Sequence, residues 1–113
     1  MYRISIVTVT YNCDDVVEET LRSVSEQDYS NLEYVVIDGA SKDGTIETIN
    51  KFWDKIDTLV SEPDHGIFDA MNKSLQYVHG NYVLFMNAGN KFVNNHVVSD
   101  IFNSYTGDAD LIY

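Results

Sequence analysis

Residues 82–90, with the sequence YVLFMNAGN, constrain the fold more than any other stretch of the chain. Five apolar or aromatic residues, Tyr82 to Met86, are followed at once by four small or amide residues. A strand that is apolar at every position is covered on both faces, which is typical of a parallel sheet with helices on each side. Ligands of such sheets bind beyond the carboxyl ends of the strands, so we expect a site at residues 87–90. The alternative is a polar turn that only ends a core strand.

Apolar runs and helical patterns alternate along the whole chain. Short runs rich in β-branched or aromatic residues predict strands at residues 4–10, 32–37, 58–60, 82–86 and 111–113. Apolar residues at helical spacing predict helices at residues 16–27, 46–56, 67–78 and 97–105. This alternation predicts right-handed crossovers and an α/β fold with three α/β/α layers around a doubly wound, mostly parallel sheet.

The order of the strands decides where a ligand can bind. If the strand at Tyr82 lies beside the first strand, in the order 3-2-1-4, the switch point falls between them. Tyr11, Asp38 and Asn87 then converge at one edge of the sheet and border a crevice. The chain ends inside the apolar run 111–113, so we expect a truncated form of a longer domain. A terminal edge strand is the alternative.

Length and composition limit the kind of protein. The chain has 113 residues, 44% of them hydrophobic, which predicts one domain over residues 1–113. Eighteen acidic and seven basic residues give a net charge of −11, which argues against nucleic acid and anionic membrane surfaces as partners. The single cysteine, Cys13, allows no internal disulfide and suits a reducing compartment. No signal peptide or membrane span is visible, and we expect a cytoplasmic protein.

Several side chains have a structural interpretation of their own. We expect Asn12 or Asp14 to cap the first helix, and Ser41 or Asp43 to cap the second. Trp53 is expected in the core rather than as a sugar platform. A further set, His65, His79 and His96, shares no metal-ligand spacing and is expected in loops or at the surface.

Asp38 directly follows a buried strand and leaves two interpretations open. Its carboxylate could accept hydrogen bonds from ribose hydroxyls or from a base edge. It could equally cap the turn at residues 41–45. The chain has neither GxGxxG nor GxxxxGK[ST], so a diphosphate would have to be held in another way.

The loop before the third helix is a second candidate site. Asp64, Asp69, Asn72 and Lys73 crowd this loop and the first turns of the helix, where free backbone N–H groups favour an anion. We include Asp64 and Asn72 among the candidate nucleotide contacts. The alternative is an exposed Asp69–Lys73 pair on one helix face.

Five blocks, taken in order, resemble the N-terminal half of family 2 glycosyltransferases. They are residues 4–12 (ISIVTVTYN), 23–29 (SVSEQDY), 34–45 (YVVIDGASKDGT), 61–73 (SEPDHGIFDAMNK) and 80–90 (GNYVLFMNAGN). The fourth block is similar to the branch associated with bacterial exopolysaccharide and colanic-acid-type assembly. The resemblance implies a GT-A fold that binds a nucleoside-diphosphate sugar, usually of uridine or guanosine, and transfers the sugar with inversion.

The resemblance also implies roles for individual residues. Thr10 and Tyr11 border the nucleotide, and Asp38 contacts its base or ribose, although Gly39 stands where the family often has a second acidic residue. Asn87 to Asn90 falls on the DxD-type segment of the family, which holds ribose and a Mg²⁺ or Mn²⁺ ion. Asn90 is an uncharged amide at the metal position, and hard cations prefer charged oxygens, so we expect weak metal binding.

The chemistry implied is an in-line displacement, with a carboxylate that deprotonates a glycan or lipid-linked acceptor and a metal that stabilises the diphosphate. In the family this base belongs to the C-terminal half, so we expect a donor half-site that does not turn over alone. A lipid-linked acceptor would bring the full-length protein to the inner face of the membrane. The alternatives are a non-catalytic nucleotide-sugar or partner-binding module and, less favoured, a nucleotidyltransferase-like domain. The sequence leaves the sugar, the linkage and the oligomeric state open, a homo-oligomer included.

Overall fold

The computed structural model describes residues 2–103 of the chain. Its elements are β1 (Ile4–Thr10), α1 (Asp14–Ser25), β2 (Leu32–Asp38), α2 (Thr45–Asn50), a 3₁₀ turn η1 (Trp53–Lys55), β3 (Thr58–Ser61), α3 (Ile67–Ser74), β4 (Tyr82–Phe85) and α4 (Val97–Asn103). The strand expected at residues 111–113 lies outside the described residues.

The four described strands form one parallel sheet in the order β3-β2-β1-β4, which confirms the expected order. The register pairs Thr10 with Asp38 and Asp38 with Ser61. Three polar side chains are thereby aligned across the carboxyl edge of the sheet. β4 pairs with β1 only from Ile4 to Val7, so the segment after β4 leaves the sheet before β1 has ended.

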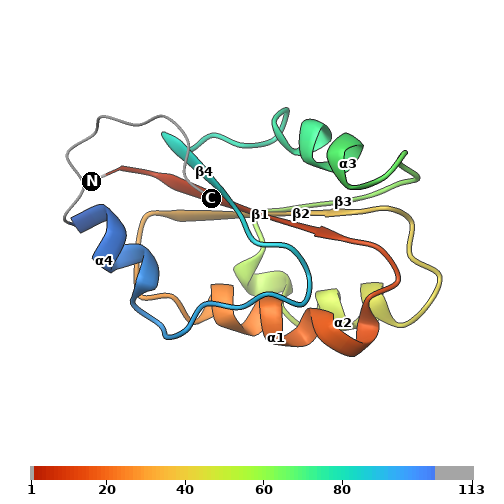
Figure 1. The fold of residues 1–113 in the computed structure, drawn as a ribbon, viewed down its shortest axis with the longest axis horizontal. Helices are drawn as coiled ribbons and strands as arrows, with labels where there is room; N and C mark the ends of the chain where they lie inside the picture. Colours follow the sequence, from red (N-terminus) through yellow and green to blue (C-terminus); the bar gives the residue numbers. More distant parts are fainter. Residues whose placement is uncertain (1, 104–113) are drawn as a thin grey trace.

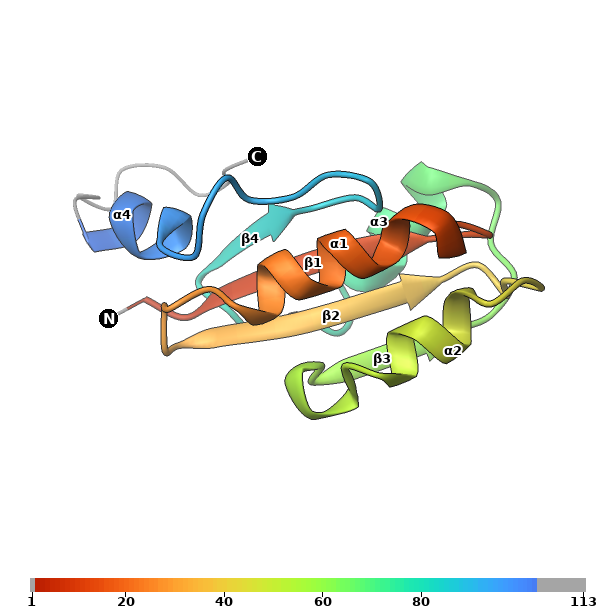
Figure 2. The ribbon, with the colours of Figure 1, turned by 90° about the horizontal axis from the view of Figure 1, so that it is seen from below.

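Helices cover both faces of the sheet, as expected of a three-layer α/β/α fold. Figure 1 shows α1, α2 and α4 on one face and α3 on the other. Seen from below, α1 lies along β1 and β2, and α2 lies over β3 (Figure 2). Alternate residues of β2 serve the two faces: Tyr34 and Val36 pack in the larger core cluster, whereas Val35 and Ile37 pack in the smaller one under α3. An uninterrupted apolar run is what such a doubly covered strand requires.

β4 is less buried than its sequence predicts. Tyr82 and Leu84 are buried, but Val83 and Phe85 are only half-buried. β4 is an edge strand of the described sheet. The face that carries Val83 and Phe85 packs against the smaller core cluster, which has strands of the sheet on only one side of β4. Both faces of β4 are therefore covered, but the face that carries Val83 and Phe85 is covered only in part.

The interpretation of Trp53 as a core residue was also wrong, since its side chain is 76% exposed. α2 ends at Asn50, and the chain continues through the tighter turn η1. The change of helical pitch keeps Phe52 and Ile56 against the core and turns Trp53 outward.

The predicted helix ends need correction as well. Cys13 is the N-cap of α1 and Gly44 that of α2, and neither cap has a side-chain hydrogen bond. Asp43 Oδ1 instead accepts a hydrogen bond from the Thr45 N–H at 3.0 Å, which is a local turn at the start of α2. α3 ends at Ser74 rather than near residue 78.

Gly80 is required by a close approach rather than by a helix end. A Cβ there would lie 2.7 Å from the backbone nitrogen of Ser5 and 2.8 Å from the carbonyl oxygen of Arg3. The chain can therefore enter β4 beside β1 only with glycine at this position.

Within residues 2–103, no helix combines the length and the apolar character needed to cross a bilayer.

Candidate functional site

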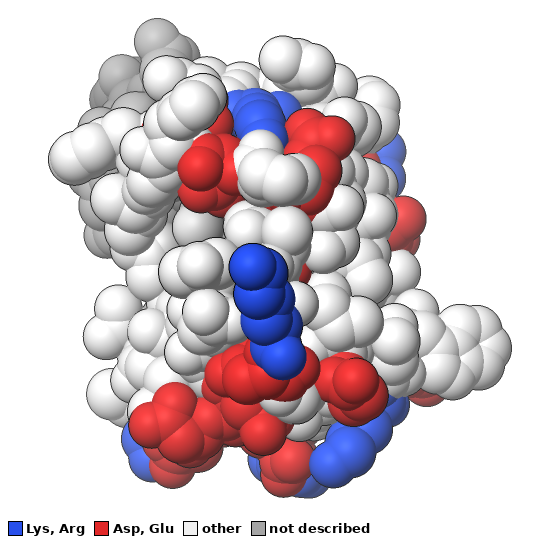
Figure 3. Space-filling view, turned by 90° about the vertical axis from the view of Figure 1, so that its right-hand side faces the viewer, with Lys and Arg blue, Asp and Glu red and all other residues white. Residues whose placement is uncertain are grey.

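The loops that follow the four strands meet around a cleft of about 670 Å³ at the carboxyl edge of the sheet. The cleft is lined by Val9, Thr10, Tyr11, Cys13, Gly39, Ala40, Lys42, Pro63, Asp64, Gly66, Ile67, Asn87 and Ala88. Figure 3 views the edge toward which β1 and β2 run in Figure 1, and there the Asp and Glu side chains gather around the few Lys and Arg side chains. The crevice predicted from the strand order is thus present.

Unusual backbone conformations are concentrated in the same four loops. Among the described residues, positive φ angles occur at Asn12 (45°), Ala40 (64°), Gly66 (113°) and Gly89 (95°), one after each strand. This conformation is uncommon for residues other than glycine and persists where the surrounding structure fixes it. Such strain is typical of functional sites.

Asp38 is fully buried and lies beneath the cleft rather than in its lining. Its Oδ1 accepts hydrogen bonds from the hydroxyls of Thr10 (2.6 Å) and Ser41 (2.6 Å). Its Oδ2 accepts from the Ser41 N–H (2.8 Å) and the Ser61 hydroxyl (2.9 Å). This carboxylate therefore joins the ends of β1, β2 and β3 and organises the turn after β2. Of the two open interpretations, the geometry favours the turn over a direct contact with a ligand.

Asp64 lines the cleft from the loop after β3. Its Oδ1 accepts a hydrogen bond from the Gly66 N–H at 3.0 Å. Its Oδ2 packs so closely on Gly39 that a Cβ at that position would come within 2.8 Å. Gly39 thus leaves space for a carboxylate brought from a neighbouring loop.

The charged residues at the start of α3 fasten this same loop. Lys73 Nζ donates to the Pro63 carbonyl oxygen at 2.8 Å and lies 3.2 Å from Glu62 Oε1. Asp69 Oδ2 accepts from the His65 N–H at 2.9 Å. Asp69 and Lys73 therefore bind the loop from its two ends instead of pairing with each other.

Asn87 lines the cleft, and its side chain holds a buried oxygen. Among the residues that the structure describes, its Oδ1 has no hydrogen-bond partner. A buried polar atom without a partner costs about 1–3 kcal/mol, so such atoms call for an explanation. This oxygen can meet a ligand in the cleft only if the amide reorients, and an N–H or O–H group of the ligand would then supply the missing bond.

Two predicted site residues lie outside the cleft lining. Asn72 is exposed on α3, and Asn90 is exposed in the turn after β4. The Asn90 N–H donates to the Asn87 carbonyl oxygen at 3.1 Å, which closes this turn. Of the predicted nucleotide contacts, Thr10, Tyr11, Asp64 and Asn87 therefore come together at the cleft, whereas Asp38 lies below it.

The side chains of Asn87 and Asn90 are poor ligands for a divalent metal. In the part of the chain that the structure describes, no three His, Cys, Asp or Glu side chains are placed to hold a metal ion. Asn87 and Asn90 offer neutral amide oxygens, which bind hard cations less strongly than carboxylates do. All lone pairs on the nearby Asp38 face protein donors.

Two residues that line the cleft were missed at the sequence level. Lys42 is the one Lys or Arg among the lining residues, and its backbone N–H donates to Asn12 Oδ1 at 2.8 Å. Cys13 is half-buried in the lining, and burial raises the pKa of its thiol. The signal for both was their position within a few residues of a predicted strand end.

The fold has known counterparts among glycosyltransferases whose structures were solved with nucleotide sugars. The chain belongs to glycosyltransferase family 2, because the family described as Glycosyl transferase family 2 matches residues 5–92. It is 30% identical over 102 residues to the Escherichia coli UDP-Glc:α-D-GlcNAc-diphosphoundecaprenol β-1,3-glucosyltransferase WfaP. The matched region covers 89% of this chain and 41% of WfaP. The chain spans less than half the length of the curated relatives that it matches.

Solved structures confirm the GT-A fold. The structure of residues 1–349 of Staphylococcus aureus TarS in complex with UDP-GlcNAc superposes with a TM-score of 0.79 at 26% identity, over 87% of this chain and 29% of that fragment. The mannosyltransferase PcManGT from Pyrobaculum calidifontis, in complex with GDP-Man and Mn²⁺, gives a TM-score of 0.76 at 31% identity, over 83% of this chain and 29% of PcManGT.

Proposed function

We propose that the cleft binds the nucleoside diphosphate of a sugar donor, UDP or GDP, and that the longer protein transfers the sugar with inversion to a glycan or lipid-linked acceptor. The observation that carries this proposal is a cleft formed by all four strand-end loops, with the buried and unpartnered Asn87 oxygen in its wall. The product would be a bacterial polysaccharide of the exopolysaccharide or colanic-acid type. TarS and PcManGT, which bind UDP-GlcNAc and GDP-Man, support the donor class.

Each lining residue has a distinct chemical role in this proposal. Tyr11, 60% exposed at the rim, offers an aromatic face for the base. The Asn87 oxygen accepts a hydrogen bond from the base or from a ribose hydroxyl. Asp38 acts indirectly, because its bonds hold the Thr10 side chain and the loop after β2 in place. Lys42 supplies positive charge toward the diphosphate.

Because the amides of Asn87 and Asn90 do not fit a divalent cation, we propose that nucleotide binding depends only weakly on Mg²⁺ or Mn²⁺. We assign no catalytic base to the described residues and expect it elsewhere in the longer protein. The chain would then bind its donor without completing a transfer. The enzyme would act in the cytoplasm, at the inner face of the membrane where the acceptor is lipid-linked. WfaP, whose name includes a diphosphoundecaprenol acceptor, supports this placement.

The second candidate function is a non-catalytic nucleotide-sugar or partner-binding module. The observation that favours it is the neutral Asn90 at the position where the family holds a metal. Sugar transfer by the longer protein would exclude this candidate. Donor binding by the longer protein without any transfer would support it.

Isothermal titration calorimetry of the chain with UDP and GDP, each with and without Mn²⁺, tests the proposal. We expect one nucleotide to bind, with less than about a threefold gain from Mn²⁺. Asn90→Asp should restore a charged ligand and raise the affinity in Mn²⁺ about tenfold, without an effect in EDTA.

Two variants serve as controls for this titration. Asn94→Asp adds the same charge at an exposed position farther along the chain and should leave the metal dependence unchanged. Ser25→Ala removes the other side-chain oxygen that is buried without a partner among residues 2–103, and should not affect nucleotide affinity because Ser25 lines a separate hollow at the opposite edge of the sheet. Failure of both UDP and GDP to bind would contradict the proposal.

A further inference from the structure

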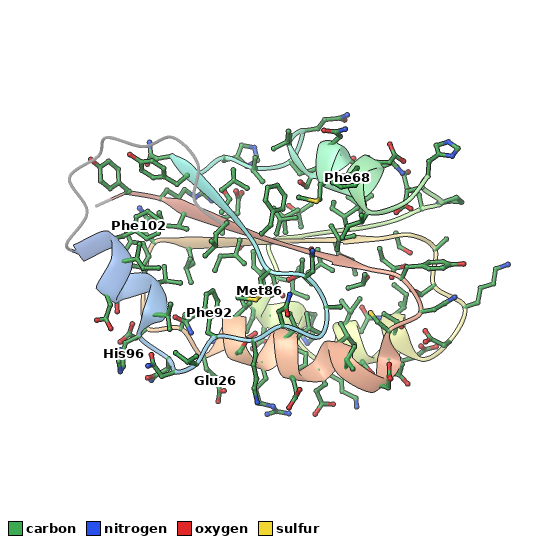
Figure 4. All side chains as sticks on the ribbon, in the orientation of Figure 1. Glu26, Phe68, Met86, Phe92, His96 and Phe102 are labelled. Carbon is green, nitrogen blue, oxygen red and sulfur yellow. The ribbon has the colours of Figure 1, made fainter. Side chains whose placement is uncertain are left out.

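The helix α1 carries a polar stripe that faces the segment between β4 and α4. The stripe consists of Thr20, Ser23 and Gln27, spaced as neighbours on one helix face, with Gln27 just beyond the end of α1. Figure 1 shows the segment running beside α1 from the end of β4 to α4. Met86 and Phe92 pack between the sheet and α1 (Figure 4) and form the apolar side of the same contact.

Each member of the stripe bonds to the backbone of the segment. The Ser23 hydroxyl accepts a hydrogen bond from the Phe92 N–H at 3.3 Å. Gln27 Nε2 donates to the Asn94 carbonyl oxygen at 2.7 Å, and its Oε1 accepts from the Val98 N–H at 3.1 Å. A segment without regular structure of its own is thereby given a fixed path along the helix.

Thr20 makes the contacts nearest to the cleft. Its side chain is fully buried. The hydroxyl donates to the Asn90 carbonyl oxygen at 2.6 Å and accepts from the Gly89 N–H at 2.9 Å. The Asn90 N–H closes the turn that begins at Asn87. The Thr20 hydroxyl therefore binds the N–H of Gly89 and the carbonyl of Asn90, on either side of the peptide unit that closes the turn.

We propose that Thr20 is a positioning residue for the nucleotide site: it holds the turn at residues 87–90 and thereby keeps Asn87 in the wall of the cleft, where its side chain can contact the donor. This role rests on the proposed function of the cleft. Thr20 lies outside the lining of the cleft and acts only through the turn. A turn that is fixed before binding spares the donor the cost of ordering it.

Thr20→Val is the direct test, because valine has nearly the same shape but cannot form either hydrogen bond. The turn then populates other conformations, and the apparent dissociation constant rises in inverse proportion to the competent fraction. We expect UDP or GDP to bind about tenfold more weakly to Thr20→Val. Thr20→Ser keeps the hydroxyl and should restore affinity to within about twofold of the wild type.

Thr8→Val is the matched control for a general loss of stability. Thr8 is also fully buried, and its hydroxyl shares a 2.7 Å hydrogen bond with the Tyr34 hydroxyl inside the sheet. This variant should lose stability but not nucleotide affinity. The double variant Thr20→Val, Asn87→Ala should bind no more weakly than Asn87→Ala alone, since both changes remove the same contact.

Amide hydrogen exchange adds a measurement that needs no ligand. The Gly89 and Asn90 amides should exchange faster in Thr20→Val than in Thr8→Val, because only the first change frees the turn. Equal exchange rates, equal affinities of Thr20→Val and Thr8→Val, or additive losses in the double variant would each overturn the positioning role. Absence of UDP and GDP binding to the wild type would instead refute the nucleotide site itself.

Discussion

One carboxylate organises the carboxyl edge of the sheet through four hydrogen bonds. Three of the four donors to Asp38 are hydroxyls, of Thr10, Ser41 and Ser61, and these can rotate to accept a hydrogen bond instead. Only the Ser41 N–H is a fixed donor. The edge therefore needs a planar group with at least one acceptor oxygen at position 38, and it does not need a negative charge there.

Substitutions at Asp38 should separate these two requirements. Asp38→Ala removes the acceptor of four hydrogen bonds, among them that of the buried Thr10 hydroxyl, and should lower the free energy of unfolding by about 3 kcal/mol. In Asp38→Asn the amide oxygen can serve the Ser41 N–H while the amide N–H₂ donates to the hydroxyls of Thr10 and Ser41, so the loss should be about 1 kcal/mol. Urea denaturation measures both values. Equal losses would mean that the charge itself stabilises the edge.

At the level of elements, a second buried carboxylate joins the opposite edge of the sheet. Glu33 on β2 is 3% exposed and accepts hydrogen bonds from the Ser5 hydroxyl (2.7 Å), the His79 N–H (2.7 Å) and His79 Nδ1 (2.8 Å). Burial raises the pKa of Glu33, but the hydrogen bonds from Ser5 and His79 and the charge of Arg3 together bring it below 4.5. The start of β4 is thereby tied to β1 and β2.

The lowered pKa of Glu33 predicts a loss of stability in acid. Because the pKa is lower in the folded than in the unfolded state, the stabilisation is complete above pH 4.5 and is lost as the pH falls through the folded value. The free energy of unfolding should therefore fall less steeply below pH 4.5 in Glu33→Gln than in the wild type. Glu47→Gln, at an exposed position of α2, should keep the wild-type slope. An unchanged slope in Glu33→Gln would contradict this account.

The sequence correctly predicts the elements in which the spacing of apolar residues matches the residues that are buried in the structure. β1, β2 and β4 are apolar runs with sharp polar ends, and their alternation with helices predicts parallel strands. The strand order was a condition of the site prediction rather than a consequence of this pattern, and the structure meets it. Trp53 was misplaced because the change from α2 to η1 depends on packing rather than on spacing. The site was predicted only in part for the same reason. Thr10, Tyr11 and Asn87 follow from strand ends, whereas the burial of Asp38 depends on partners from three separate strands.

At the level of the whole molecule, net charge opposes the proposed ligand. The chain carries a charge of −11, and a nucleoside diphosphate is itself an anion. At an ionic strength of about 0.01 M the screening length is about 30 Å, comparable to the diameter of a small domain, so every acidic side chain repels the diphosphate. At about 0.15 M the length is about 8 Å, and only nearby charges such as Lys42 still act.

Added salt should therefore strengthen UDP binding, in contrast to most binding of anions by proteins. We expect UDP affinity measured in EDTA to rise about threefold between ionic strengths of about 0.01 M and 0.15 M. Uridine, which has no phosphate, is the control, and its affinity should not change. Weaker UDP binding at the higher salt concentration would mean that the local attraction of Lys42 dominates the field of the whole chain.

Cys13 allows a label to be attached in the wall of the cleft without any substitution in the chain. It is the one cysteine of the chain, and it forms part of the cleft wall between the end of β1 and the start of α1. Any thiol-directed fluorophore or spin label added to the native sequence is therefore delivered to a single place, beside the proposed base site. Because burial raises the pKa of the thiol, labelling proceeds faster in alkaline buffer. The protein thus carries its own reporter of occupancy, one suited to screening nucleotide sugars whose transfer cannot yet be assayed.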